Sequence, residues 1–388
     1  MNYFSRIEKE GLSISRNNTP NAIALPSIHK AKYLISLEGK NVFFSGLNML
    51  SSRSFKAVFA KKILSVLYRM GLIKYLCKSH LINIDKNSAL LSFVNQSYRE
   101  LGGVNIYLGT AKTENFSLTL QVLNHNKEYY LRYPVSDSAK KHAANELNNI
   151  NYLQTRGINA IQRLDKVIQV EENKLYAYEG IPSSKTKSDF CGRKIKLLQE
   201  LTGPDYEMVK ENSSFQELNG LIKNMLVQSE GVWDHLRDIY EQIVGIISSF
   251  FIRKAFFHGD FSPDNILISG KQSYLIDFEY SCIDFFACFD LFHYFYKAKN
   301  FHRKKITLED LKIVDTHVKK VYESYPFFDN FQKDKFAMLK YLYIFYLFIL
   351  LKRYIVDEKI NIHNEVINNL VHSIQSLFFE NALIEKVK

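Results

Sequence analysis

Cysteine is scarce in this chain, which contains four cysteines among 388 residues. No two of them form a CxxC pair, and no histidine lies at a zinc-ligand spacing from them, so neither a disulfide framework nor a zinc site is expected. The scattered positions are Cys77, Cys191, Cys282 and Cys288. This cysteine usage favours a reducing compartment.

Long apolar runs and targeting signals are also missing. The longest apolar run, residues 341–351, lies between Lys340 and Lys352. It falls well short of the ~20 residues that a membrane-spanning helix needs. The N-terminus lacks a basic segment followed by an apolar stretch, which is the pattern of a signal peptide. The sequence therefore predicts a buried helix over the apolar run and a cytoplasmic protein.

Basic residues are in excess but are not clustered. The formal net charge is +11 and the pI is about 9.1, yet the 51 Lys and Arg residues form no run of five. Such an excess of positive charge can give a protein affinity for nucleic acid, anionic lipid or phosphorylated substrates. Because no basic stripe or recognised module accompanies it, no nucleic-acid partner is expected.

Residues 1–95 form a predicted N-terminal extension. Residues 31–45 are typical of two short strands around a turn at Glu38, and helices are expected over 54–70 and from Ala89 onward. Lysines face apolar residues across the helix at 54–70, which favours a helix docked on its own domain and leaves a membrane-surface helix as the alternative.

Residues 96–181 are predicted to form a small α+β lobe. Alternating apolar residues indicate three antiparallel strands over 104–109, 116–123 and 128–133. A helix capped by Ser136 should follow and end at Gly157. Strands return over 166–182.

Residues 182–388 are predicted to be mostly helical apart from 256–277. Apolar residues over 236–250 repeat at helical spacing, and Thr307 with Asp310 resembles a capping box that begins a further helix. Helices are also expected over 335–355 and 364–379. The aromatic stretch 285–296 is assigned to the core, and the alternative is a cage for a quaternary ammonium group.

The segment 256–279 carries the residues that point to chemistry. It reads FFHGDFSPDNILISGKQSYLIDFE, in which two short apolar strands should form a hairpin through residues 269–272. This hairpin brings Asn265 beside Asp277, and an amide oxygen with a carboxylate suits magnesium together with waters and nucleotide phosphates. Asp260 adds a second carboxylate, which can accept a proton from an attacking hydroxyl.

The HGDxxxxN pattern followed by Asp-Phe-Glu resembles the aminoglycoside phosphotransferase and choline kinase superfamily. The resemblance covers roughly residues 95–300 by element order. It implies an α+β, protein-kinase-like two-lobe fold, with a small antiparallel-sheet N-lobe and a mostly helical C-lobe. It also implies an enzyme that uses ATP, or another nucleoside triphosphate, and Mg²⁺ to phosphorylate a hydroxyl of a small molecule.

The resemblance assigns roles within this segment. Asp260 would be the catalytic base, and Asn265 and Asp277 would hold magnesium. His258 would keep the catalytic loop in shape, and Glu279 would assist a second magnesium ion or orient the acceptor.

The resemblance also assigns upstream positions to the nucleotide. Arg132, positioned by the next helix's Glu146, would contact the phosphates. Backbone groups of a hinge would bind adenine, and its residues are Glu179, Gly180 and Ile181. The loop at 109–115 lacks GxGxxG, so Lys112 or threonine hydroxyls would contact the phosphates there.

Several alternatives stay open at this point. The acceptor is a sugar, an amino sugar, a choline-like alcohol, or a glycan or lipid precursor, the last with peripheral membrane or glycan-lipid contact. A kinase-fold protein that binds nucleotide without turnover is the alternative to an enzyme. Protein-kinase activity is disfavoured because HRD, DFG and APE are absent. The oligomeric state is not predicted.

Overall fold

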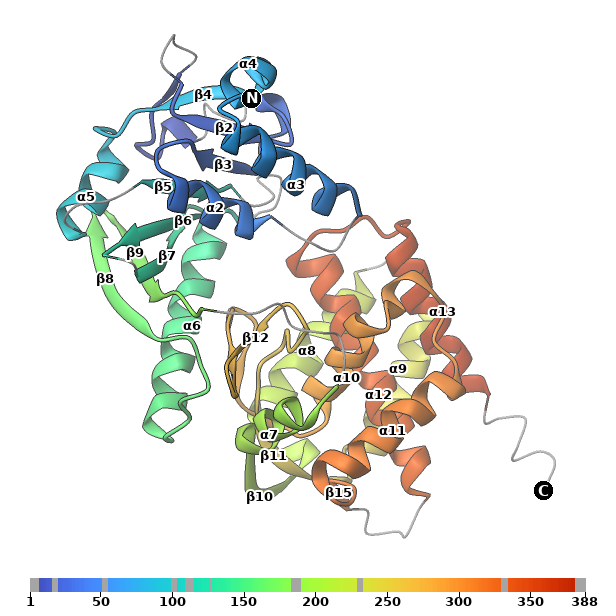
Figure 1. Ribbon diagram of the computed structural model, residues 1–388. Helices are drawn as coiled ribbons and strands as arrows, with labels where there is room; N and C mark the ends of the chain where they lie inside the picture. Colours follow the sequence, from blue (N-terminus) through green and yellow to red (C-terminus); the bar gives the residue numbers. More distant parts are fainter. Residues whose placement is uncertain are drawn as a thin grey trace. The chain divides into compact units, whose positions relative to one another are not determined.

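The computed structural model divides the chain into two compact units (Figure 1). The first unit comprises Met1–Ala143 and Gln162–Ile181, and the second comprises Ala144–Ile161 and Pro182–Lys388. The structure describes residues 7–15, 20–50, 55–98, 103–108, 115–125, 127–182, 190–228, 233–328 and 334–380.

The first unit is built on one antiparallel sheet with the strand order β1-β4-β2-β3-β5-β6-β7-β9-β8. Its strands are β1 (Ile14–Ser15), β2 (Ala22–Leu25), β3 (Tyr33–Ser36), β4 (Leu81–Ile84), β5 (Val104–Tyr107), β6 (Ser117–Asn124), β7 (Lys127–Pro134), β8 (Leu164–Val170) and β9 (Asn173–Glu179). Tyr33 of β3 pairs with Tyr107 of β5, so the strands of residues 1–95 continue the sheet of residues 104–179. The division into parts 1–95, 96–181 and 182–388 stays a prediction.

The first unit also contains helices, and one of them corrects the sequence analysis. They include α2 (Lys40–Met49), α3 (Phe55–Arg69), α4 (Ile73–Leu76), α5 (Ala89–Ser97) and the start of α6 (Asp137–Thr155). The second strand expected within 31–45 is wrong, because α2 begins at Lys40 after Gly39, whose φ is +87°. In α2, Val42, Phe43 and Leu47 are buried at helical spacing.

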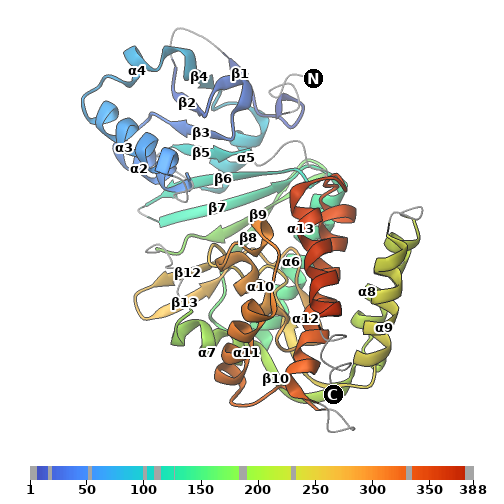
Figure 2. The same ribbon diagram turned by 90° about the vertical axis from the view of Figure 1, so that its right-hand side faces the viewer.

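Helix α3 is docked on its own unit, but not by the face that the sequence indicated. The Tyr68 ring stacks on Phe43 of α2 with 4.0 Å between centroids, and Leu64 is buried in the same cluster. Figures 1 and 2 show α2 and α3 side by side. Phe59 and Met70, which we expected to pack inward, are 56% and 63% exposed. Sequence periodicity misidentified the buried face because both faces carry apolar residues.

Helix α6 agrees with its prediction. The Ser136 hydroxyl accepts a hydrogen bond from the Ala139 N–H at 3.2 Å, and Gly157 adopts φ +75° after the helix ends. A serine that bonds a first-turn N–H satisfies one of the donors that a helix start leaves open. Ile150 and Leu153 are fully buried.

The second unit is mainly helical and contains the predicted hairpin. Strands β12 (Ile266–Ser269) and β13 (Gln272–Leu275) pair in antiparallel register. Figure 2 shows the helices, which are α7 (Gly192–Leu201), α8 (Ser213–Val227), α9 (Asp234–Ile247), α10 (Phe289–Ala298), α11 (Leu308–Tyr322), α12 (Lys335–Lys352) and α13 (Glu365–Phe379). The Thr307–Asp310 capping box that begins α11 is present as predicted.

A second sheet in this unit was not predicted. Its strands are β10 (Thr202–Met208), β11 (Phe251–Phe257), β14 (Cys282–Phe286) and the short β15 (Phe327–Phe328). Three residues lie between the end of α9 and strand β11, which is short and rich in apolar residues, and periodicity alone cannot separate a strand from a helix in such a segment. Strand β10 contains Gly203 and Pro204, which are disfavoured in strands.

The core of the second unit is aromatic and surrounds α12. This helix is buried from Leu342 to Leu351, as predicted for the longest apolar run. The aromatic stretch 285–296 is buried as well, which supports its assignment to the core. Among the described residues, no helix combines the length and the apolar character needed to cross a membrane.

Candidate active site

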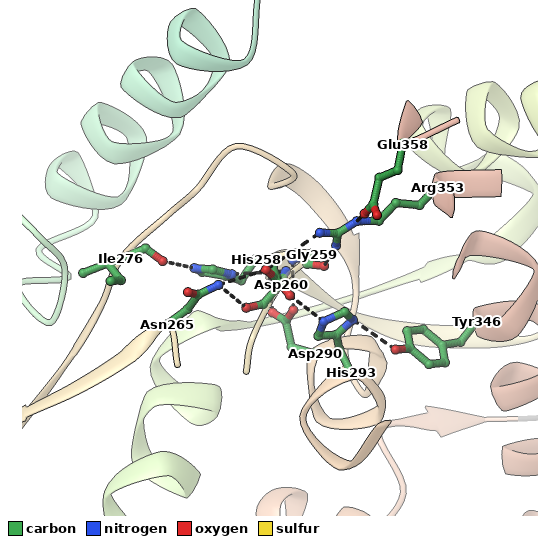
Figure 3. Close-up of polar contacts among 10 residues, drawn as sticks. All are labelled: His258, Gly259, Asp260, Asn265, Ile276, Asp290, His293, Tyr346, Arg353 and Glu358. Carbon is green, nitrogen blue, oxygen red and sulfur yellow. Dashed lines mark hydrogen bonds and ion pairs between the residues drawn. The ribbon is translucent and has the colours of Figure 1, made fainter. Parts of the chain in front are cut away.

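The loop between β11 and β12, residues 258–265, is held at its start by Asp290 of α10 (Figure 3). The Asp290 carboxylate accepts hydrogen bonds from the backbone N–H groups of His258 at 2.8 Å and Gly259 at 3.1 Å. Burial raises the pKa of Asp290 to about 7, although the two N–H donors oppose this. Gly259 has φ +77°, and a Cβ there would lie 2.3 Å from the Tyr280 carbonyl oxygen. Glycine is therefore required at this turn.

His258 links this loop to the end of β13. Its Nε2 lies 3.1 Å from the Ile276 carbonyl oxygen, and its Nδ1 accepts the Asp260 N–H at 3.3 Å. A neutral ring with its proton on Nε2 satisfies both contacts. Burial lowers the pKa of His258 to about 4, so the ring is neutral near pH 7. These contacts fit the predicted role in shaping the loop.

Asp260 is held by donors from three different elements. His293 Nε2 of α10 lies 2.7 Å from Oδ1, Asn265 Nδ2 donates to Oδ2 at 3.0 Å, and an Arg353 nitrogen lies 3.8 Å from Oδ2. Burial alone would raise the pKa of this carboxyl, but the hydrogen bond from His293 and the Arg353 charge outweigh it and lower the pKa well below 3.8. Asp260 is therefore an anion over the physiological pH range.

Arg353 follows α12 in a π-helical turn, Arg353–Asp357, and supports the loop from outside. One of its terminal nitrogens donates to the Gly259 carbonyl at 3.0 Å, and Nε donates to Glu358 at 3.0 Å. The guanidinium also lies 3.6 Å from the centroid of the Tyr280 ring. Its positive charge near Asp260 is thereby fixed by several contacts.

The hairpin places Asn265 next to the residue that precedes Asp277. The Ile276 N–H donates to the Asn265 carbonyl at 3.1 Å, and Asp277 follows with φ +67°. Asn265 Nδ2 also donates to the Asp260 carbonyl at 3.0 Å. The amide nitrogen is used within the loop, so the amide oxygen of Asn265 remains for a ligand.

These residues fit a magnesium ion by the chemistry of their donors. Asn265 and Asp277 offer an amide oxygen and a carboxylate, and magnesium commonly takes one or two protein oxygens together with waters and phosphates. Among the described residues, no group of three or more His, Cys, Asp or Glu side chains could hold a metal ion. The described residues therefore contain no site in which protein side chains alone would surround a metal ion. The magnesium role stays a prediction.

Glu279 lies two residues beyond Asp277 in a turn anchored by α6. Asn149 Nδ2 donates to the Ser281 carbonyl at 3.2 Å and to its hydroxyl at 2.7 Å. Asn145 Nδ2 donates to the same carbonyl at 3.1 Å. The Glu279 side chain is half-buried, and its assignment to a second magnesium ion or to the acceptor stays a prediction.

The predicted hinge ends β9 in the first unit. The Glu179 N–H donates to the Arg163 carbonyl at 2.9 Å, and the Gly180 N–H donates to the Glu128 carbonyl at 2.6 Å. A Cβ on Gly180 would lie 2.6 Å from the same Glu128 oxygen. These two N–H groups are therefore occupied, and the role of the hinge in binding a base stays a prediction.

The remaining predicted nucleotide residues lie on separate elements. Arg132 is on β7, where it pairs with Thr119 and Tyr176, and its side chain is half-buried. Glu146 is on the part of α6 in the second unit and is 3% exposed. Their pairing stays a prediction. Lys112 lies outside the described residues.

His293 and Arg353 were missed by the sequence analysis. They lie 33 and 93 positions after Asp260, and neither belongs to a local motif. His293 follows Asp290 by three positions on α10, so it shares the face of the loop-bracing carboxylate. That spacing is the signal that could have indicated it. The residues around Arg353 form no pattern that would indicate its position beside the loop.

Comparison with known proteins identifies this segment. Residues 251–298 match the model of the phosphotransferase enzyme family. A comparison with curated proteins found no match.

The solved structures similar to this chain are phosphotransferases and kinases. One is an aminoglycoside phosphotransferase mutant in ternary complex with ADP and hygromycin B, with a TM-score of 0.50 and 10% identity over 74% of this chain and 99% of that chain. Another is spectinomycin phosphotransferase in complex with ADP and spectinomycin, with a TM-score of 0.44 and 15% identity over 76% of this chain and 97% of that chain. A third is amicoumacin kinase in complex with AMP-PNP and Ca²⁺, with a TM-score of 0.42 and 11% identity over 68% of this chain and 86% of that chain.

The chain therefore has a kinase-like fold of the α+β class, as predicted. At such low sequence identities, the similarity to these structures concerns the fold alone. The matched segment contains His258, Asp260, Asn265, Asp277 and Asp290. This segment therefore resembles the phosphotransferase enzyme family, as predicted, and the match agrees with the predicted enzyme class.

Proposed function

We propose that the protein transfers the γ-phosphoryl group of ATP, or of another nucleoside triphosphate, to a hydroxyl group of a small molecule. The observation that supports this proposal is the position of Asp260, which His293 and Asn265 hold in a loop that matches the phosphotransferase enzyme family. Phosphoryl transfer needs mainly positioning and charge neutralisation from a protein. The site offers both.

Asp260 would receive the acceptor hydroxyl. Since its pKa lies well below 3.8, it acts in the resting enzyme as a hydrogen-bond acceptor that orients the hydroxyl toward the phosphoryl group. It takes the proton as the new bond forms and the hydroxyl becomes more acidic. Asn265 and Asp277 would hold Mg²⁺, which neutralises phosphate charge when bound.

The nucleotide would contact residues on several elements. Arg132, with Glu146, is proposed to contact the phosphates, and an arginine can bind a phosphate through two parallel N–H groups. Ile181, the last residue of the hinge, would bind the base through its backbone. Similar solved structures contain ADP, AMP-PNP or GDP, so ATP and GTP are both candidates. We also propose a cytoplasmic location, where these nucleotides are available.

The acceptor is proposed to be a sugar, an amino sugar, a choline-like alcohol, or a glycan or lipid precursor. The similar structures contain spectinomycin and hygromycin B, which makes hydroxyl-rich small molecules the first class to test. The N-terminal extension and the net charge of +11 favour a precursor of a surface glycan or a lipid head group. Selective use of aminoglycosides would contradict that preference.

The test is acceptor-dependent ADP release by the purified full chain with ATP and Mg²⁺. A panel of sugars, lipid-linked sugars, choline and aminoglycosides should contain at least one stimulating acceptor. Asp260→Asn should lower the rate ~10²- to 10⁴-fold, the usual contribution of a general base, and should retain nucleotide binding.

Asp264→Asn provides the matched control. Asp264 is an exposed carboxylate in the same loop, so its neutral variant should keep the wild-type rate. If no acceptor stimulates the wild type and Mg²⁺ does not tighten nucleotide binding, the protein is instead a nucleotide-binding or scaffold protein.

A further inference from the structure

The outer face of α3 carries a row of large exposed apolar side chains, and the following helix α4 exposes two more. Along α3 and the residue that follows it, positions 59, 63, 66 and 70 are separated by four, three and four residues, which places them in one stripe. Their exposed fractions are 56% for Phe59, 42% for Ile63, 52% for Val66 and 63% for Met70. Tyr75 and Leu76 on α4 are 70% and 66% exposed. We call these six residues the α3–α4 surface.

The α3–α4 surface lies in the most basic part of the chain. Residues 39–84 contain eight lysines and arginines and no aspartate or glutamate, so this stretch accounts for +8 of the formal net charge of +11. Five of these cations lie within or next to α3 and α4 with exposed side chains, and they are Lys56, Lys62, Arg69, Lys74 and Lys78. Single exposed apolar residues need no explanation, but an aligned row bordered by cations does.

The inner face of α3 already provides its anchoring to the protein. Leu64 is buried, and the Tyr68 ring stacks on Phe43 of α2. These contacts dock the helix through its inner face, so the exposed stripe belongs to a helix that is already docked.

We propose that the α3–α4 surface binds the face of an anionic lipid bilayer. Helices that lie in the bilayer interface combine an apolar stripe with lysines and arginines, and each basic residue near an anionic leaflet adds attraction. A second copy of the chain fits less well, because two such surfaces would bring their positive charges together. An anionic bilayer matches both the apolar row and the charge.

This inference goes beyond the proposed function, because it concerns where the enzyme works and not what it transfers. Binding through α3 would hold the protein at a membrane without any helix that crosses it. It would concentrate the enzyme next to lipid-linked molecules. The two proposals can fail separately, since vesicle binding is measured without nucleotide or acceptor.

The experiment is co-sedimentation of the full chain with vesicles of phosphatidylcholine alone or mixed with phosphatidylglycerol. We expect binding to the mixed vesicles that weakens as salt is added, and little binding to phosphatidylcholine. The variant Phe59→Ser, Val66→Ser and Met70→Ser should lower the partition coefficient about 10-fold or more. Lys62→Gln, Lys74→Gln and Lys78→Gln together should lower it roughly 100-fold, at about fivefold per basic residue.

A matched control removes exposed apolar residues elsewhere. Leu221, Val227 and Phe379 are 42%, 63% and 53% exposed in the second unit, and their serine variants should bind vesicles like the wild type. Circular dichroism and the melting temperature should be unchanged in all these variants. Absence of binding to the mixed vesicles, or equal loss in the control variant, would overturn the proposal. So would concentration-dependent dimers that disappear in the Phe59, Val66 and Met70 variant, since a second copy would then be the partner.

Discussion

The carboxylate of Asp260 is kept in its charged form by residues that lie far apart along the chain. Burial works against that charge, and the hydrogen bond from His293 and the nearby Arg353 reverse its effect. The His293 ring is itself fixed by the Tyr346 hydroxyl, which lies 3.0 Å from Nδ1. The acid–base state of the central residue is therefore set by a chain of contacts, and not by the loop alone.

Replacing His293 should weaken catalysis and shift its pH dependence. In His293→Ala the Asp260 carboxylate loses its shortest hydrogen bond, so its pKa should rise toward the ordinary range. We expect kcat to fall about 10- to 100-fold, the loss of one hydrogen bond to a charged group. The acidic limb of the kcat profile should move to higher pH. Steady-state rates across pH measure both effects.

Tyr346→Phe is the control for this prediction. It removes the contact to Nδ1 but leaves the Nε2 donor of His293 in place, so the acidic limb should move little. A His293→Ala enzyme with an unchanged pH profile and a lower melting temperature would show that His293 is only structural.

Gly259 and Gly270 offer a comparison between steric conflict and backbone strain. Both have positive φ, +77° and +56°, but a Cβ on Gly259 would lie 2.3 Å from the Tyr280 oxygen, while a Cβ on Gly270 would meet no neighbouring atom within 4 Å. Gly270→Ala should cost about 1 kcal/mol of unfolding free energy, from its left-handed backbone alone. Gly259→Ala should cost several times that and abolish activity, because the loop must move. Urea unfolding of both variants tests this; equal costs would contradict it.

At the scale of elements, helix α10 contains a buried aspartate and a buried histidine. Their pKa shifts have opposite effects on how the free energy of unfolding changes with pH. Asp290 and His293 lie one turn apart, and both contact the loop of residues 258–265. Burial raises the pKa of Asp290 to about 7 and lowers that of His293 to about 4. In each case the neutral form is favoured. The helix start thus holds the loop with one acid and one base that both resist ionisation.

These shifts predict how stability depends on pH. His258 and His293 have pKa values near 4 when folded and about 6.5 when unfolded, so between these values the unfolded chain binds more protons and acid destabilises the protein. Asp290 has the opposite sign, because its folded pKa is raised and its contribution to stability grows as pH falls from about 7. Two histidines outweigh one aspartate, so the free energy of unfolding should fall from pH 6.5 toward 4.5.

Single variants separate the two signs. His293→Gln removes one of the two histidines, so the decrease in stability toward acid should become shallower. Asp290→Asn removes the opposing group, so the decrease should become steeper, whatever its effect at pH 7. Urea midpoints measured from pH 4.5 to 7.5 decide this. Slopes that change in the same direction in both variants would contradict the assignment.

Elements with a local cause were predicted well, and elements fixed by tertiary contacts were not. The start of α6 at Ser136 and the capping box at Thr307 rest on side chains within three residues. The hairpin of β12 and β13 likewise follows from two short runs and a turn. Strand β11 has no such local cause, because its pairing with β10 and β14 joins segments distant in sequence. The outward face of α3 also depends on what packs beneath it.

At the scale of the whole molecule, the assigned roles are divided between the two units. Arg132 and the hinge belong to the first unit, whereas Asp260, Asn265 and Asp277 belong to the second. The sequence predicted the loop residues because a spacing rule defines them within twenty positions. It could not predict His293 or Arg353, whose approach to Asp260 requires the folded helical unit.

Magnesium and nucleotide should therefore stabilise the protein together more than either does alone. A ligand that binds only the folded state adds about 2.7 kcal/mol when present at 100 times its Kd, which raises the melting temperature by a few degrees. If Asp277 holds Mg²⁺, Asp277→Asn should reduce the increase caused by ATP with Mg²⁺ and leave the increase caused by ATP with EDTA unchanged. Asp264→Asn, the exposed neighbour in the same loop, should behave like the wild type in both conditions. An Asp277→Asn protein that retains the full magnesium-dependent increase would show that the ion is held elsewhere, and the assignment of Asn265 and Asp277 would then have to be abandoned.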